Sequence, residues 1–212
     1  MEIDDFLVTA SNQEAVGWIS RWPNWHAHGL VLTGLSGSGK THAMALWLSR
    51  SGGRKLDRAE LVSTSASELC AAGAVFAYDD VDNLAQDTKA EEALFHLYNR
   101  VKELGGHLVL TLSKSVTQAG FALPDLRSRL LTLPVAHLDA PDDTLLEGLI
   151  VKQFRDRQIT LDVGVVSYLA ARASRDAASL RALVDRLDQV SLAQGRRITV
   201  ALARSILESP NV

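Results

Sequence analysis

The segment Gly34–Thr41 constrains the fold of this chain more than any other part of its 212 residues. It reads GLSGSGKT and fits the pattern G-x-x-x-x-G-K-[S/T] in full. An apolar run at 29–33 precedes it and a helical pattern at 41–50 follows it, which is the strand–loop–helix context that the motif requires. The alternative is a glycine-rich turn that happens to carry Lys-Thr. The context on both sides favours a phosphate-binding P-loop.

The P-loop predicts a nucleotide site with a defined set of residues. In such a loop the backbone N–H groups and the helix N-terminus together form a cradle for phosphate. Lys40 can reach the β- and γ-phosphates, and the Thr41 hydroxyl can ligate Mg²⁺. The expected nucleotide-binding residues are Gly34, Leu35, Ser36, Gly37, Ser38, Gly39, Lys40 and Thr41.

Short apolar runs alternate with helical patterns through the first two thirds of the chain. Besides 29–33, strands are expected at 74–78, 107–112 and 130–135, and a helix is expected at 89–104. Strands separated by helices predict a parallel sheet sandwiched between helices. We therefore expect residues 1–140 to form an α/β nucleotide-binding domain.

No strand of comparable strength follows residue 140, and the remaining patterns are helical. Helices are expected at 142–157, 164–173, 177–193 and 199–208. Residues 141–212 are therefore expected to form a small all-helical domain.

Charge limits the kinds of partner that this chain is expected to bind. The formal net charge is −3, but residues 1–150 carry 12 Lys and Arg against 19 Asp and Glu, whereas residues 151–212 carry 10 against 6. The C-terminal part is thus positive by 4 and the rest negative by 7. Solvated helix faces often produce such a split, so it is a weak indication of an anionic partner. We expect no direct sequence-specific DNA binding.

The composition also predicts where the protein resides. No apolar run approaches the roughly 18 residues that cross a bilayer, and the acidic N-terminus has no signal-peptide pattern. A cytoplasmic protein without a membrane partner is expected. The single Cys70 and six scattered His residues provide neither an internal disulfide nor a zinc-ligand cluster.

Polar residues that follow two of the expected strands are candidates for catalysis. Asp79 and Asp80 end the run at 74–78; Asp79 is the expected magnesium residue, and Asp80 can orient an attacking water. Ser113 ends the run at 107–112 and can hydrogen-bond the γ-phosphate or that water. For the acids the alternative is a helix cap or turn, and for Ser113 a plain strand-ending serine.

Four patches in order along the chain carry a resemblance to a known family. These are 6–12 (FLVTASN), 79–81 (DDV), 95–99 (FHLYN) and 126–130 (LRSRL). They resemble the F-V-x-G-x-S-N, D-D-I, F-H-x-F-N and R-L-K-S-R-F stretches of the DnaA-like AAA+ family. The resemblance implies an AAA+ fold with a helical lid. It also implies that Leu7 and Val8 contact the nucleotide and that Arg129 acts on the nucleotide of another subunit. From the residues alone, the alternative for 125–130 is a solvated, salt-bridged loop.

Within this family the chain resembles the stand-alone regulators of the Hda type. That resemblance implies a cytoplasmic regulator of replication initiation that binds ADP or ATP with Mg²⁺ and promotes hydrolysis of ATP held by a DnaA-type initiator. Its own turnover is expected to be slow. The sequence leaves open whether the protein forms a homo-oligomer. The alternatives are a helicase-loader-like AAA+ ATPase and, from a different class, a self-sufficient P-loop kinase.

Two departures from the family pattern concern partners and the lid. The chain reaches Val212 without a helix-turn-helix domain after the lid, and no short glutamine-containing peptide for binding the sliding clamp precedes residue 6. The family's lid arginine, about six residues before 184–188 (VDRLD), is matched here by Ala178. Arg175 and Arg181 flank it by three residues on either side, and either can substitute for it.

Overall fold

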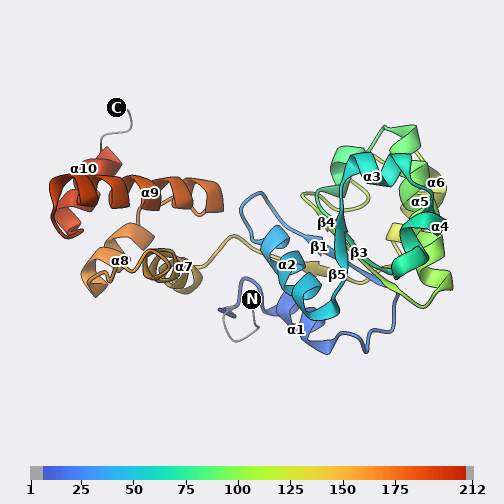
Figure 1. Cartoon of the computed structure of the whole chain (residues 1–212), viewed down its shortest axis with the longest axis horizontal. Coiled ribbons are helices and arrows are strands. Elements are labelled where there is room, and N and C mark those ends of the chain that lie inside the picture. The colour runs from blue at the N-terminus through green and yellow to red at the C-terminus, as the bar shows by residue number, and fades with distance from the viewer. Residues whose placement is uncertain (1–6, 209–212) are drawn as a thin grey trace.

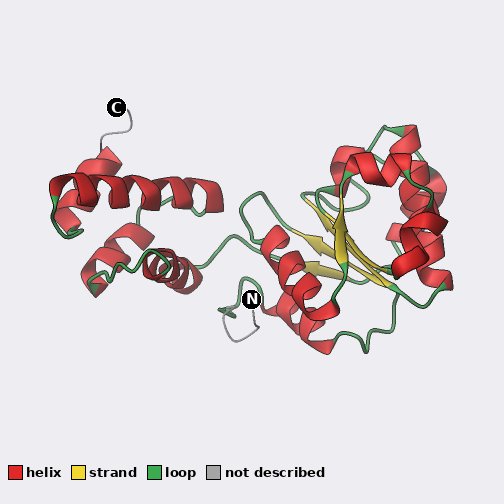
Figure 2. Ribbon diagram, viewed as in Figure 1, coloured by secondary structure: helices red, strands yellow, loops and turns green. Residues whose placement is uncertain are grey.

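The chain folds into a layered α/β part followed by a separate group of helices (Figure 1). The computed structural model describes residues 7–208, apart from the side chains of Ala177 and Ala178. A central sheet lies between two layers of helices, and the last four helices lie to one side of it, as Figure 2 shows by secondary structure. The predicted fold class is confirmed. Within the described residues, no helix has the length and apolar character needed to cross a membrane.

The sheet contains five parallel strands in the order β2-β3-β4-β1-β5. Leu32 of β1 pairs with Thr111 on one side and Ala136 on the other. Because all strands run in the same direction, their carboxyl ends meet at one edge of the sheet. The bounds are β1 Gly29–Thr33, β2 Arg54–Leu56, β3 Val75–Tyr78, β4 His107–Leu112 and β5 Val135–His137.

Three of the expected strands are confirmed to within one residue, and the fourth is wrong. Helix α6, Pro124–Leu130, occupies the start of the region expected at 130–135, and the strand begins only at Val135. The helix forms because Leu126 and Leu130 lie one turn apart and are both fully buried, while a proline occupies its first turn. Strand β2 was not expected from the sequence.

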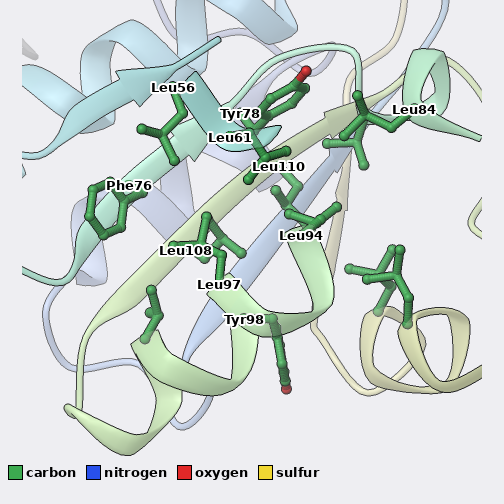
Figure 3. Packing of buried hydrophobic residues seen from close by; sticks show 14 of the residues in the cluster. Leu56, Leu61, Phe76, Tyr78, Leu84, Leu94, Leu97, Tyr98, Leu108 and Leu110 are labelled. Carbon is green, nitrogen blue, oxygen red and sulfur yellow. The ribbon is translucent and has the colours of Figure 1, made fainter. Parts of the chain in front are cut away.

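The helices on one face of the sheet enclose a large apolar core (Figure 3). Phe76 and Tyr78 of β3 and Leu108 of β4 belong to this core together with Leu94 of α5. Sequence alternation on the strands explains the selection of these residues, since side chains two apart lie on the same face. The layer consists of α3 Arg58–Ser63, α4 Ala66–Leu69, α5 Thr88–Glu103 and α6, with short 3₁₀ turns at Cys70–Ala72 (η2) and Val81–Leu84 (η3).

Two helices, α1 (Gln13–Arg21) and α2 (Lys40–Ser51), cover the opposite face. Leu30 and Leu32 of β1 face them, whereas Val31 between the two faces the other layer. Trp47 of α2 is fully buried and stacks on Trp25 with 5.9 Å between ring centroids. This packing fixes α2, and with it the P-loop, against the sheet.

The four C-terminal helices form a group with its own core, which we call the lid. Its core consists only of residues between 146 and 207, among them the fully buried Ile150 and Phe154. The segment 138–142 joins it to β5, and Ser11 accepts a hydrogen bond from the backbone of Asp139 at 3.0 Å. The helices are α7 Asp143–Arg155, α8 Val163–Ala170, α9 Ala177–Gln194 and α10 Val200–Glu208. The domain boundary at 140/141 stays a prediction.

Candidate functional site

The P-loop lies at the carboxyl edge of the sheet, between the end of β1 and the start of α2. Gly37 and Gly39 have φ values of +80° and +94°, a backbone conformation that residues with a Cβ rarely adopt. A Cβ on Gly34 would lie 2.2 Å from the carbonyl oxygen of Leu138. The glycines are therefore required by the loop's shape and by the chain that passes beside it.

Lys40 is the buried cation of this loop. The residue is only 6% exposed, and its Nζ donates to the carbonyl oxygens of Gly34 at 2.8 Å and Leu35 at 3.0 Å. Ser38 is also buried, and its hydroxyl has no hydrogen-bond partner among the described residues. The loop thus holds one fixed positive charge and one unpaired hydroxyl.

Asp79 connects three elements at the edge of the sheet. Its Oδ2 accepts from Thr41 at 3.0 Å and from Lys55 Nζ at 2.9 Å, and its Oδ1 accepts from Thr111 at 2.6 Å. Thr41 belongs to the first turn of α2, Lys55 to β2 and Thr111 to β4. The sequence-predicted magnesium residues Thr41 and Asp79 are thus in direct contact.

The two neighbouring acids have opposite protonation tendencies. Burial raises the pKa of the Asp79 carboxyl, but hydrogen bonds from Thr111 and Lys55, the charge of Lys55 and the Thr41 hydroxyl outweigh it, so the net pKa is lowered. Burial and then the charge of Asp79 raise the pKa of Asp80. Asp80 also has a φ of +52°, and its backbone N–H donates to Thr111 Oγ1 at 2.8 Å.

Ser113 lies at the end of β4, as expected, and contacts an acid that the sequence did not single out. Its hydroxyl donates to the carboxylate of Asp82 in η3, and its backbone N–H lies 3.3 Å from both Asp82 oxygens. Ser113 also lines a small cavity of about 370 Å³ together with Gly34 and Leu35. Its role toward a phosphate stays a prediction.

The lid reaches the P-loop through the start of α9. Asp176 caps this helix by accepting from the backbone N–H of Ser179 at 2.7 Å. A Cβ on Gly37 would lie only 2.9 Å from the Asp176 Cα, so loop and lid are in close contact there. The two arginines proposed from the sequence behave differently. Arg175 bonds to the Pro141 carbonyl and the Asp143 carboxylate at the start of α7, and the exposed Arg181 forms no ion pair with a described residue.

We expect Gly37→Ala to loosen the contact between the P-loop and the lid. The added methyl group meets the backbone of Asp176, which cannot move without moving α9. Protease cleavage of the segment 138–142 should become about fivefold faster if opening is made easier by about 1 kcal/mol. Gly52→Ala is the matched control, because Gly52 has a φ of +64° but nothing within 4 Å of an added Cβ. Equal cleavage of the two variants would contradict the contact.

Arg129 is not one of the residues that line a cavity together with the P-loop, although its neighbours Leu130 and Leu131 are. It occupies the last turn of α6, not a loop end before a strand, and its side chain is exposed. Its guanidinium forms no hydrogen bond or ion pair with any residue of 7–208 that the structure describes. It lines an open groove of about 1110 Å³ together with His28 and residues of α5. The structure thus gives no local carboxylate partner for Arg129.

Leu7 and Val8 lie at the junction between the α/β part and the lid. They are 43% and 49% exposed, and Leu7 lies against α7, where a Cβ on Gly148 would be 2.4 Å from its Cδ2. The Leu7 carbonyl accepts from the side-chain amide of Asn12 at 2.9 Å. The predicted contact of Leu7 and Val8 with nucleotide stays a prediction.

Four side chains of this site were missed by sequence reasoning: Lys55, Asp82, Thr111 and Asp176. Thr111 carried a signal, because it is a polar residue within the apolar run 107–112 and lies in register at the point where β3 ends. Lys55 belongs to a three-residue edge strand with no recognisable pattern, and Asp176 belongs to a different part of the chain. Only the tertiary structure brings these two to the P-loop.

Comparison with known proteins identifies the fold. Residues 143–207 match the family model described as the Hda lid domain. Domain III of the replication initiation protein DnaA from Thermotoga maritima superimposes with a TM-score of 0.84 at 17% identity, over 98% of this chain and 95% of that one. This chain has an AAA+ fold. The predicted resemblance to DnaA-like AAA+ proteins with an Hda-type lid is therefore confirmed.

Two further solved AAA+ structures show how widely this fold is shared. AMPPCP-bound DnaA from Aquifex aeolicus gives a TM-score of 0.74 at 14% identity, over 92% of this chain and 66% of that one. The RuvB Holliday junction branch migration motor of Thermotoga maritima gives 0.73 at 15% identity, over 100% and 72%. At these identities the likeness is one of AAA+ architecture.

Proposed function

We propose that this protein is a nucleotide-binding AAA+ regulator of replication initiation of the Hda type. It acts by pairing with a DnaA-type initiator and promoting hydrolysis of the ATP that the initiator holds. The observation that carries this proposal is the Hda-type lid at 143–207 on a chain with a complete P-loop. A regulator of chromosome replication acts in the cytoplasm, which is where we place this protein. The sliding clamp is a second partner to be tested.

The nucleotide is ADP or ATP, bound at Gly34–Thr41. A DnaA structure with the same fold contains AMPPCP, an adenine nucleotide analogue. In this chain the buried Lys40 ammonium and the buried, unpaired Ser38 hydroxyl fit a phosphate, because an unpaired buried donor costs free energy that an acceptor oxygen removes. We also assign Leu7 and Val8, which lie at the junction with the lid, to contact with the nucleotide.

Thr41 and Asp79 offer the oxygen atoms that a magnesium ion accompanying the nucleotide would use, although Lys55 already pairs with Asp79. The Thr41 and Asp79 oxygens lie 3.0 Å apart, and Mg²⁺ prefers oxygen ligands. When bound, Mg²⁺ neutralises charge on the phosphates. Asp80 and Ser113 are assigned to positioning water and phosphate for this chain's own hydrolysis, which we propose to be slow.

We assign to Arg129 the action on the nucleotide held by the partner. Its exposed guanidinium has no carboxylate partner among the described residues, and Arg129 is not among the residues that line the cavity beside Gly34 and Leu35. A guanidinium is always charged and presents a planar set of donors, which suits it to stabilise a transferring phosphoryl group. An exposed arginine with no partner among the described residues supports action in trans.

The test is to add the purified protein to ATP-loaded DnaA, with and without clamp on DNA, and to measure the ADP formed. We expect the protein to increase ADP formation on DnaA. A protein that leaves this rate unchanged but binds single-stranded DNA and a replicative helicase would instead be a helicase loader. Phosphate transfer to a small acceptor in the absence of any partner would identify a kinase.

A further inference from the structure

Asp79, the carboxylate proposed to bind magnesium, already forms an ion pair with Lys55. Lys55 of edge strand β2 pairs in register with Ala77 of β3, two residues before Asp79, so all three side chains lie on the face that α2 covers. From there the lysine reaches Asp79, with 2.9 Å between its Nζ and Oδ2.

Two hydroxyl groups also donate to the Asp79 carboxylate. Thr111 donates to Oδ1 at 2.6 Å, and Thr41 lies 3.3 Å from Oδ1 and 3.0 Å from Oδ2. The Asp79 side chain is only 12% exposed, whereas that of Lys55 is 47% exposed. The carboxylate is thus held on the inside by hydroxyl groups, and its outer side faces the lysine.

We propose that the Lys55 ammonium takes the place of a divalent cation at Asp79, so that adenine nucleotide binds to this protein with little dependence on Mg²⁺. The inference rests on the proposed nucleotide site. A divalent ion that approaches the Asp79 oxygens meets the Lys55 ammonium, and like charges at this separation repel strongly where water is partly excluded. The Lys55 ammonium is also a second positive charge, besides that of Lys40, at the carboxyl edge of the sheet.

The experiment compares ADP affinity in excess EDTA with ADP affinity in Mg²⁺, measured by calorimetry. For the unmodified protein we expect the two affinities to agree within about threefold. For Lys55→Met we expect binding in EDTA to be at least about tenfold weaker than in Mg²⁺, because the resident charge is lost and the carboxylate becomes available to the ion. Lys55→Arg keeps the charge and should resemble the unmodified protein.

Lys102→Met is the matched control. Lys102 is an exposed lysine in the last turn of α5, just before the amino end of β4 and thus away from the carboxyl edge of the sheet. It should leave the ratio of the two affinities unchanged. A second control uses Asp79→Asn, in which Lys55→Met should no longer increase the magnesium dependence. Thermal melting establishes that each variant is folded.

The outcomes separate this inference from the function on which it rests. Nucleotide binding with the same strong magnesium dependence in the unmodified protein and in Lys55→Met would overturn the role of Lys55 and leave the P-loop assignment standing. A folded, unmodified protein that binds no adenine nucleotide in either buffer would overturn the proposed function, and the role of Lys55 with it.

Discussion

Lys40→Ala is expected to abolish adenine-nucleotide binding, with affinity at least about 100-fold lower, or about 2.7 kcal/mol. Lys40 is the only ammonium within the loop 34–41, and it is held in place by the carbonyl oxygens of Gly34 and Leu35. Its loss removes the fixed positive charge beside the phosphates. Calorimetric titration with ADP and Mg²⁺ measures the effect.

The control for this variant addresses folding. Removing a buried charged donor lowers stability by about 1–3 kcal/mol, so a melting curve must accompany the titration. Lys40→Met keeps the length of the side chain without its charge and should lose binding equally. Unchanged nucleotide affinity in a folded Lys40→Ala protein would remove the P-loop interpretation.

Arg129→Ala is expected to eliminate the stimulation of ATP hydrolysis on DnaA, while the variant's own ADP affinity and melting temperature stay unchanged. An arginine supplied in trans contributes about 10³ to 10⁵ to the rate of phosphoryl transfer. Stability should not change, because the exposed guanidinium has no partner within the described residues. ADP formed on DnaA at a single turnover measures the loss.

Arg127→Ala is the matched control for that variant. Both arginines are exposed on α6, but two residues along a helix correspond to about 200° of rotation, so they point in nearly opposite directions. Arg127→Ala should retain stimulation. If Arg129→Ala stimulates hydrolysis as well as the unmodified protein does, the trans-acting role is wrong.

The parts of the fold that could be predicted are those with a strong local pattern. The P-loop defines a strand before it and a helix after it, and Asp79 follows a continuous apolar run, so β1, α2 and the end of β3 were located from the sequence. The lid helices were located because their apolar stripes recur at helical spacing. In these segments local and tertiary preferences agree.

The parts that could not be predicted depend on tertiary structure. Residues 124–133 are rich in leucine and fit a strand or a helix, and burial of Leu126 and Leu130 against the core selects the helix. Lys55 and Asp176 come to the site only through the edge pairing of β2 and the packing of the lid.

The central claim is that the nucleotide hydrolysed is the one on the partner. The most direct measurement is a single-turnover reaction in which labelled ATP is bound to DnaA and unlabelled ADP to this protein, in the presence of clamp on DNA. The account predicts that labelled ADP forms much faster with the unmodified protein than without it, and that Arg129→Ala does not accelerate its formation. Labelled ADP that forms at the same rate with and without the protein would contradict the account.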